Sequence, residues 1–295
     1  MRTFMLTIGL ALFVTIVIGF GVLHFYKSKP IVEYDYVTLD IPAGSFGTRV
    51  LGINDLAEVV GHGAEPLSGF LYKKGTTSTV RVPGSSFDEI SAINNVGVIA
   101  GSYVDSVTKL SRAFLYRDEK FTILEHPAAR YSYAYGINDR GDIVGFYVDD
   151  RGSHGFLYTD NSFFDLDFPG VFDTRATGIN NKGRIVGFYL QPKDKRFHGF
   201  IHDNGKFTTL DYPEPDVFHT RLQSINDRGD IVGFCSCGPQ RAARGFLYRD
   251  GIFTDIQVIR AQETFPNAIN GHGVIVGFYN GSDGGHGFYA IPRKR

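Results

Sequence analysis

A Thr-Arg pair occurs three times in the chain, at Thr48-Arg49, Thr174-Arg175 and Thr220-Arg221. An aromatic residue stands two positions before each pair: Phe46, Phe172 and Phe218. A guanidinium group can bind a carboxylate or a phosphate through two parallel hydrogen bonds. Three such groups brought together would therefore hold a carboxylate, a phosphate or an acidic sugar. In the competing interpretation each Arg pairs with a nearby acid, such as Asp173 or Asp216, and only ties parts of the fold together.

Histidines form a second group of residues that could do chemistry. Basic residues precede a Gly-Phe or Ala-Phe dipeptide at five places: Arg112, His154, His198, Arg244 and His286. Three imidazoles would bind zinc if they met at one point. These three belong to different repeats of the chain and to a strand that is not the innermost one, so we expect structural roles for them. We predict no metal site and no other cofactor.

Both cysteines of the chain, Cys235 and Cys237, lie in one short segment. A disulfide between residues i and i+2 would be strained. A free or metal-binding pair stays open, and the simplest interpretation is two loop cysteines without a common role. Two cysteines are too few to form a disulfide framework.

The composition favours a β-rich protein that does not bind nucleic acids. Its 30 basic and 31 acidic residues give a net charge of -1, whereas a nucleic-acid binder shows a basic excess. The 295 residues include 36 Gly, 26 Phe and 16 Tyr. Together with β-branched residues, these favour many short strands joined by tight turns.

Three sequence landmarks recur along the chain with one common period. The dipeptide Ile-Asn begins at positions 53, 93, 137, 179, 225 and 269, so successive copies lie 40 to 46 residues apart. A Gly follows eight positions after each Ile. A Gly-Phe or Ala-Phe dipeptide occurs once in each repeat, at 69, 113, 155, 199, 245 and 287. Four short strands in roughly 40–45 residues are typical of one propeller blade.

The repeats predict the fold class. We expect an all-β, six-bladed β-propeller of four-stranded antiparallel blades over residues 31–295. The last repeat lacks a fourth strand, and residues 34–42, which precede the first repeat, resemble one. We therefore predict that an N-terminal strand completes the last blade and closes the ring, because closure removes exposed sheet edges.

Residues 3–26 contain no Asp, Glu, Lys or Arg and are rich in Leu, Ile, Val and Phe. A helix of roughly 20 apolar residues crosses a bilayer. The run is longer than the roughly 7–15-residue core of a secretory signal, and Gly19-Phe20-Gly21 is a poor cleavage site. We predict that residues 1–30 form a signal anchor with one transmembrane helix. A cleaved signal peptide, followed by secretion, is the alternative.

The repeat resembles the HAF-type extracellular repeat family in two elements. These are Gly-Ile-Asn-Asp-Arg-Gly-Asp-Ile-Val-Gly-Phe-Tyr at 136–147 and His-Gly-Phe-Leu-Tyr at 154–158. The resemblance spans residues 34–291, although the His-Ala-Phe tripeptide that names the family is mostly His-Gly-Phe or Arg-Gly-Phe here. The family is regarded as exported and has no assigned activity. The resemblance therefore implies a propeller outside the cytoplasm, periplasmic or extracellular, and adds no catalytic residue.

The Thr-Arg pairs fall where the last strand of one repeat crosses to the first strand of the next. A propeller chain normally enters each blade at its innermost strand, so these residues should lie at the mouth of the central channel. The longer loops share that face, and loops on a rigid scaffold commonly carry binding sites. We predict a ligand site there, formed by Thr48, Arg49, Thr174, Arg175, Thr220 and Arg221, with Tyr133 on its less charged side.

The sequence leaves several functions open. No nucleophile motif, phosphate loop or pair of carboxylates stands out, so no catalytic residue is predicted. We expect a binding or interaction scaffold for a small anionic ligand, a glycan or a protein. A hydrolase or lyase with its site at the channel mouth is the alternative, and a structural envelope protein is the third interpretation. Converging polar groups with shifted pKa values would favour the enzyme, and an arginine- and aromatic-lined mouth would favour the binder.

Overall fold

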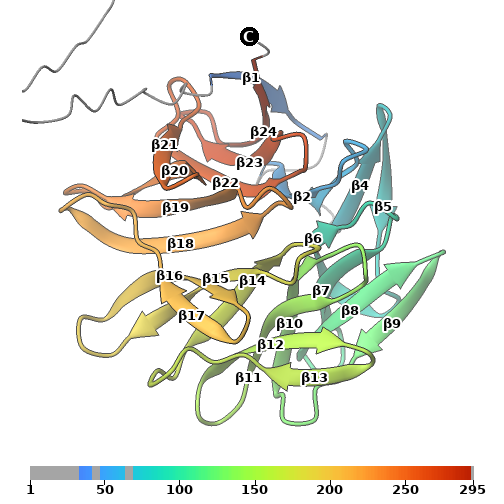
Figure 1. Cartoon of the computed structure of the whole chain (residues 1–295). Coiled ribbons are helices and arrows are strands. Elements are labelled where there is room, and N and C mark those ends of the chain that lie inside the picture. The colour runs from blue at the N-terminus through green and yellow to red at the C-terminus, as the bar shows by residue number, and fades with distance from the viewer. Residues whose placement is uncertain (1–32, 42–46, 64–68, 294–295) are drawn as a thin grey trace, which may run out of the picture. The chain divides into compact units, whose positions relative to one another are not determined.

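The chain folds into six four-stranded antiparallel sheets arranged around a common centre (Figure 1). The computed structural model describes residues 33–41, 47–63 and 69–293, so the predicted membrane segment at 1–30 lies outside the described residues. The predicted all-β propeller with six four-stranded blades is confirmed. Within the described ranges, no helix is long and apolar enough to span a bilayer.

Each blade runs from its innermost strand outwards, and the strands have the following bounds. Blade one consists of β2 (Arg49–Ile53), β3 (Val59–His62), β4 (Gly69–Lys73) and β5 (Thr76–Val80). Blade two consists of β6 (Ser85–Ile93), β7 (Ile99–Asp105), β8 (Ser111–Arg117) and β9 (Lys120–Leu124). Blade three consists of β10 (Tyr131–Ile137), β11 (Ile143–Val148), β12 (Ser153–Thr159) and β13 (Ser162–Asp165).

The second half of the chain repeats this order. Blade four consists of β14 (Thr174–Ile179), β15 (Ile185–Gln191), β16 (Arg196–Asp203) and β17 (Lys206–Thr209). Blade five consists of β18 (Val217–Ile225), β19 (Ile231–Cys237), β20 (Ala242–Arg249) and β21 (Ile252–Ile256). Blade six consists of β22 (Glu263–Ile269), β23 (Ile275–Asn280), β24 (Gly285–Pro292) and β1 (Tyr34–Leu39).

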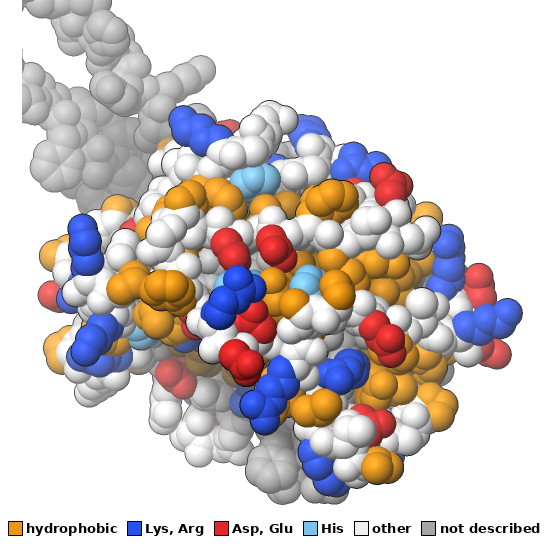
Figure 2. All heavy atoms as spheres, turned by 90° about the horizontal axis from the view of Figure 1, so that it is seen from below, with side chains coloured by type: hydrophobic (Ala, Val, Ile, Leu, Met, Phe, Trp, Pro, Cys, Tyr) orange, Lys and Arg blue, Asp and Glu red, His pale blue; other side chains and the backbone are white. Residues whose placement is uncertain are grey.

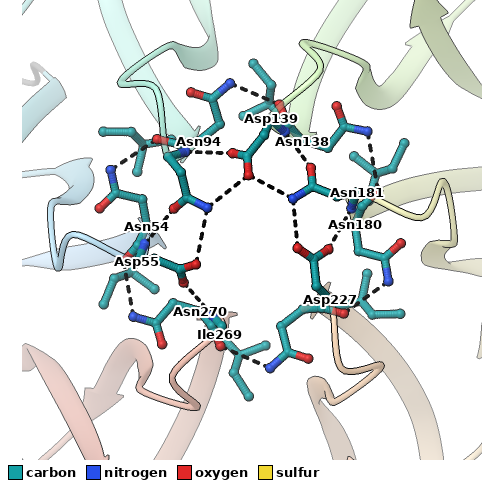
Figure 3. Close-up of a pocket in the computed structure, with 18 residues that line it drawn as sticks. Asn54, Asp55, Asn94, Asn138, Asp139, Asn180, Asn181, Asp227, Ile269 and Asn270 are labelled. Atoms are coloured by element: carbon teal, nitrogen blue, oxygen red, sulfur yellow. Dashed lines mark hydrogen bonds between the residues drawn. The ribbon is translucent and has the colours of Figure 1, made fainter.

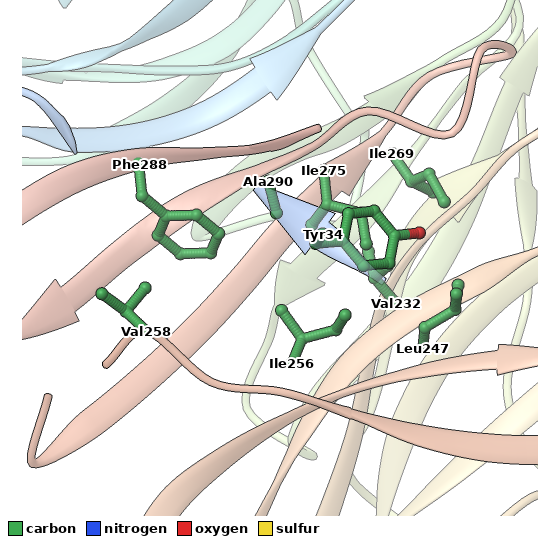
Figure 4. Close-up of a cluster of buried hydrophobic side chains, with 9 residues drawn as sticks. All are labelled: Tyr34, Val232, Leu247, Ile256, Val258, Ile269, Ile275, Phe288 and Ala290. Atoms are coloured by element: carbon green, nitrogen blue, oxygen red, sulfur yellow. The ribbon is translucent and has the colours of Figure 1, made fainter. Parts of the chain in front are cut away.

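Blade six joins the two ends of the described chain. Its outer strand β1 pairs with β24 from Tyr34 opposite Pro292 to Leu39 opposite Gly287. The Tyr34 ring is 8% exposed and packs into an apolar cluster that includes Ile256 and Ile275 (Figure 4). Segments more than 240 residues apart in sequence are therefore held together by a full ladder of backbone bonds and by buried side chains.

The Asn of each Ile-Asn dipeptide belongs to a closed belt of hydrogen bonds around the channel (Figure 3). Its side-chain Nδ2 donates to the backbone carbonyl oxygen of the Asn in the next blade, over 3.0 to 3.3 Å. The sixth bond runs from Asn270 back to Asn54, so the belt is complete. All of its members are at most 5% exposed: Asn54, Asn94, Asn138, Asn180, Asn226 and Asn270.

The same side chains hold the tight turn between the first two strands of each blade. In blade four, Oδ1 of Asn180 accepts hydrogen bonds from the backbone N–H groups of Lys182 and Arg184, at 3.1 and 3.0 Å. Its Nδ2 donates to the carbonyl oxygen of Asn226 at 3.1 Å. A buried polar side chain needs partners for both its donor and its acceptor. Only a short amide supplies both here, which explains why Asn recurs.

A second ring surrounds the same end of the channel, one residue further along each turn. It consists of Asp55, Asn95, Asp139, Asn181, Asp227 and Gly271, and encloses a cavity of about 80 Å³. The Asp139 carboxylate accepts hydrogen bonds from the side chains of Asn95 and Asn181, at 3.0 and 2.8 Å. These polar groups bind one another across blade boundaries, so this end of the channel serves to join the blades.

The other two landmarks pack against each other inside every blade. In blade three, Gly145 lies opposite Phe156 in the ladder between β11 and β12. A Cβ atom on Gly145 would collide with the backbone carbonyl oxygen of Tyr133, and the Phe156 ring fills the space beside it. The corresponding Phe rings of all six blades are at most 4% exposed. The spacing of Gly and Phe in the sequence is thus set by a contact in the blade core.

The outer surface carries mixed charge. Acidic and basic side chains are interspersed on the face that Figure 2 shows, in keeping with the near-zero net charge. The most exposed large apolar side chains are Val107, Ile259 and Phe172, which lie in loops of different blades.

Replacing Asn180 with Ala should lower the free energy of unfolding by about 3 kcal/mol. The change removes three buried hydrogen bonds, each with a net value of about 1 kcal/mol. Urea denaturation measures the loss. Val96→Ala is the control, because Val96 lies in the equivalent turn of blade two and is 61% exposed. A loss no larger than that of the control would show that the belt does not stabilise the fold.

Candidate functional site

A β-bulge interrupts the innermost strand of every blade at the same place. The register with the second strand shifts by one residue at each of these six positions. Bulges re-aim side chains, and the extra residues line a cavity of about 100 Å³ in the channel: Leu51, Ser91, Tyr135, Thr177, Gln223 and Asn267. The Ile residues of the Ile-Asn dipeptides line this cavity and the Asn cavity, so they separate the two.

The channel mouth lies two residues before each bulge residue. These positions hold Arg49, Glu89, Tyr133, Arg175, Arg221 and Phe265. Their direct partners on the second strands are His62, Ser102, Phe146, Phe188, Phe234 and Phe278. Directly paired residues point to the same face of a sheet. The mouth is therefore lined by guanidinium groups and aromatic rings, the arrangement that the sequence analysis associates with a binder.

Arg175 and Arg221 come from neighbouring blades. Both contact the same two aromatic rings of blade four, Phe188 and Phe197. The Arg221 guanidinium lies 4.5 Å from the ring centre of Phe197 and 5.1 Å from that of Phe188. The Arg175 guanidinium lies 4.8 Å from the ring centre of Phe146 and 5.8 Å from that of Phe188. Cation–π contacts of this kind attract a guanidinium to the ring without using its N–H groups as hydrogen-bond donors.

The two arginines differ in their anionic partners. Arg175 donates to Asp173 from Nε and a terminal nitrogen, at 3.0 and 3.2 Å, as the ion-pair interpretation predicts. Arg221 forms no hydrogen bond or ion pair with any described residue, and its Nε is buried without a partner. Burial, and then the charge of Arg175, lower the pKa of Arg221, although the group stays cationic at neutral pH. The structure thus contains a half-buried cation without a counter-ion of its own.

Arg49 lies apart from this pair, in blade one. Its guanidinium is 4.7 Å from the ring centre of Phe278 in blade six, and it pairs with no acid among the described residues. Burial, and then the charge of Arg49, lower the pKa of the neighbouring His62 to about 4. The predicted triad is therefore one adjacent pair and one separate arginine on the same rim.

The three predicted threonines have structural roles. Their side chains are at most 2% exposed. The Oγ1 atoms of Thr48, Thr174 and Thr220 accept hydrogen bonds from the backbone N–H groups of Ile41, Phe168 and Tyr212, at 2.8 to 3.1 Å. Each one fixes the crossover that leads into its blade. The prediction that they contact a ligand therefore lacks support, because the hydroxyl groups are used inside the fold.

Tyr133 lies in blade three, between Glu89 of blade two and Arg175 of blade four in the ring of mouth positions. Its ring stacks on Phe146 with 4.7 Å between ring centres. Two of its neighbours, Glu89 and Tyr135, were not predicted from the sequence as site residues. Both become visible when the six repeats are aligned on the Ile-Asn dipeptide, since Glu89 occupies the Arg175 position and Tyr135 the bulge position.

Glu89 is a carboxyl group without an ion pair among the described residues. Burial raises its pKa, while the charge of Arg49 and the hydroxyl of Ser91 act in the opposite direction. Burial also raises the pKa of Tyr135, and the charge of Glu89 adds to that shift. Two titratable groups with shifted pKa values therefore meet where the mouth opens into the cavity, an arrangement that favours the enzyme interpretation.

The three histidines hold the third strand of their blades to neighbouring loops. In blade four, the His198 ring is held between Asp211, 2.7 Å from Nδ1, and Asp194, 3.0 Å from Nε2. Although burial opposes it, these two acids raise the pKa of His198. His154 and His286 bind Asp167 and Asp40 in the same way. These contacts support the structural role that the sequence predicts for the three histidines.

The two cysteines differ from the expectation. Cys235 and Cys237 are joined in a disulfide, which the sequence analysis disfavoured. Both lie in β19, at 0% and 8% exposure, and not in a loop. Successive side chains of a strand point to opposite faces, so residues two apart point to the same face, and the two sulfur atoms meet there.

Comparisons with known proteins support the fold alone. No family model and no curated protein matches the chain, so the similarity to the HAF-type repeats is confined to the motifs. A virginiamycin B lyase from Staphylococcus aureus is 12% identical, with a TM-score of 0.51, over 88% of this chain and 100% of that one. A gluconolactonase from Xanthomonas campestris is 11% identical, with a TM-score of 0.53, over 88% of this chain and 90% of that one. Similarity at such low identity shows the fold alone.

Replacing Glu89 with Gln should raise the free energy of unfolding at pH 7. Burial raises the pKa of Glu89 above its value in the unfolded chain, so stability falls as the pH rises through that interval. Gln cannot ionise and avoids this loss. The gain should vanish at about pH 3, below the ordinary Glu pKa of about 4.3. Urea denaturation at both pH values tests it, and a variant less stable than the parent at pH 7 would contradict this prediction.

Proposed function

We propose that the propeller is a binding scaffold that holds an anionic, carboxylate-bearing ligand at the channel mouth. One observation carries the proposal: Arg221 is half-buried between aromatic rings, its Nε has no partner, and the nearest acid, Asp173, is bound to Arg175. A cation removed from water without a counter-ion destabilises a fold. A ligand carboxylate that reaches the terminal nitrogens of Arg221 would supply the missing counter-ion.

The geometry of the mouth also specifies how such a ligand would be held. The Arg175 and Arg221 guanidinium groups lie 4.8 and 4.5 Å from the ring centres of Phe146 and Phe197. The in-plane N–H groups that remain match the two oxygens of a carboxylate. Tyr133 and Phe265 would contact the uncharged part of the ligand, and the cavity lined by Thr177 and Gln223 would accept a polar group.

The cellular location is part of the proposal. Residues 3–26 form an uncharged apolar run, and the motifs resemble those of an exported repeat family. We propose a single-pass membrane protein whose propeller lies outside the cytoplasm, where it would meet small carboxylates or acidic sugars. The release of a soluble form that begins near Lys27 would indicate a cleaved signal peptide instead.

Replacing Arg221 with Ala should weaken carboxylate binding at least tenfold, because a charge-assisted hydrogen bond contributes about 1.5–3 kcal/mol. Calorimetric titration of the full-length chain with galacturonate measures the effect, with uncharged galactose as the negative probe. Raising the salt concentration should weaken the binding of the parent, since salt screens exposed charges.

The matched control is Arg117→Ala, which removes one positive charge from the opposite face, at the end of β8. Arg221→Gln keeps most of the side-chain volume, and its melting temperature separates a folding defect from lost binding. Equal affinity of the parent and of Arg221→Ala for galacturonate would disprove the proposed site. The same holds if the parent binds neither galacturonate nor other small carboxylates.

A second function rests on Glu89 and Tyr135. We propose as the alternative a hydrolase or lyase in which Glu89 gives or takes a proton while the arginines hold an anionic substrate. A carboxyl group with a raised pKa can serve as a general acid or base near neutral pH. Glu89 lies at the rim and Tyr135 lines the cavity directly below, so a bound substrate would contact both.

Replacing Glu89 with Gln should abolish turnover while anion binding is kept or strengthened, because the change removes a negative charge from the rim. Lactone hydrolysis can be followed by proton release, and elimination by the ultraviolet absorbance of the unsaturated product. Tyr131→Phe, a change at the start of β10 outside the mouth, is the control. Turnover by the Gln variant at the parent's rate would exclude Glu89 as the catalytic residue.

A further inference from the structure

A shallow groove runs outwards from the mouth between blades four and five. It consists of two hollows of about 180 and 290 Å³, which share Arg196, Pro215, Val217 and Phe218 in their linings. The inner hollow also contacts Phe197, whose ring packs under the Arg221 guanidinium. The groove therefore begins at Phe197, beside Arg221, and ends at the loop between β19 and β20.

A continuous row of rings connects the mouth to the outer hollow. The backbone N–H of Phe197 donates to Nδ1 of His219 at 2.9 Å, and the two ring centres lie 5.1 Å apart. The His219 ring lies 4.2 Å from that of Phe218. The Arg241 guanidinium is 3.6 Å from the Phe218 ring centre, and that of Arg196 is 5.5 Å away.

The row carries several positive charges, and one acid, Asp216, lines the outer hollow beside them. Burial lowers the pKa of His219, and the charges of Arg221, Arg241 and Arg196 lower it further, so all three arginines act on one ring. Neither the Arg196 nor the Arg241 side chain forms an ion pair with a described residue; the Arg196 guanidinium donates to the Val217 carbonyl oxygen, at 3.3 Å. The edges of both guanidinium groups are available to an anion.

The inner hollow also contains acceptors. Asp211 and Glu214 line it, where they bind His198 and Arg244. Carboxylates of this kind accept hydrogen bonds from hydroxyl groups but repel a bare polyanion. A ligand that presents both hydroxyl and carboxylate groups fits such a lining, and the flat faces of Pro215 and Phe218 suit a ring.

We propose that this groove is a second subsite for a linear acidic oligosaccharide, with one uronate carboxylate at Arg221 and a later one at Arg241 and Arg196. The inference rests on the proposed function and names its ligand class. An acidic peptide fits less well, because peptides commonly add to a free strand edge or fill apolar pockets. Here β16 is paired on both sides, and β18 is the innermost strand of its blade.

The test compares short and long ligands on the full-length chain. Galacturonate and its linear hexamer are titrated into the parent, Arg221→Ala and Arg241→Ala, with Arg117→Ala as the charge-matched control. We expect the parent to bind the hexamer at least tenfold more tightly than the monomer. Arg241→Ala should remove that gain and leave monomer binding unchanged, whereas Arg221→Ala should weaken both. The Arg196, Arg241 double Ala variant should likewise bind the hexamer no more tightly than the monomer.

The outcomes separate the two proposals. If monomer binding depends on Arg221 but Arg241→Ala leaves the hexamer affinity unchanged, the groove is not a subsite. The proposed site at the mouth would still stand. If Arg221→Ala binds both ligands as tightly as the parent, the proposed site at the mouth is wrong. Oligoglutamate that binds as tightly as the uronate hexamer, with the same dependence on Arg241, would overturn the sugar in favour of a peptide. The parent should bind a neutral galactose hexamer at least tenfold more weakly than the uronate hexamer. A smaller difference would show that charge does not select the ligand.

Discussion

The closed belt of Asn side chains is the constraint on which the channel depends. Each belt amide is satisfied only when the neighbouring blade presents its backbone carbonyl oxygen at the right height and distance. Six such bonds around one axis leave no free end at which the ring could open. The belt therefore fixes the radial position of all six innermost strands, and the turn bonds of the same residues fix where each strand ends.

Because the belt holds one end of the channel, the other end is free to vary. Above the Ile side chains, each innermost strand bulges and presents one residue to the cavity and one to the mouth. Nothing in the belt restricts the chemistry of these positions, and they differ strongly: Arg, Glu, Tyr and Phe all occur at the mouth. Stability and recognition are thus assigned to opposite ends of the same strands.

The sequence predicts those parts of the fold whose signal is repeated. Six copies of Ile-Asn, Gly and Gly-Phe determine the number of blades, because each copy marks a contact that every blade must make. The threonines were assigned to the ligand site because they accompany arginines, but their hydroxyl groups bind the crossover backbone. Glu89 was missed because it occurs once, and no repeat marks it as functional. The Cys235–Cys237 pairing was missed because the local direction of the strand decides it.

The mouth shows why aromatic support and ion pairing lead to different functions. An arginine paired with an acid, as Arg175 is with Asp173, has two of its nitrogens occupied and contributes mainly positive potential. An arginine held by rings, as Arg221 is by Phe188 and Phe197, keeps its terminal N–H groups free of partners among the described residues. Binding such a group costs little side-chain entropy, since its position is set in advance. The pair thus combines a strong local field with one preorganised set of donors, which is the physical requirement for selecting a carboxylate from water.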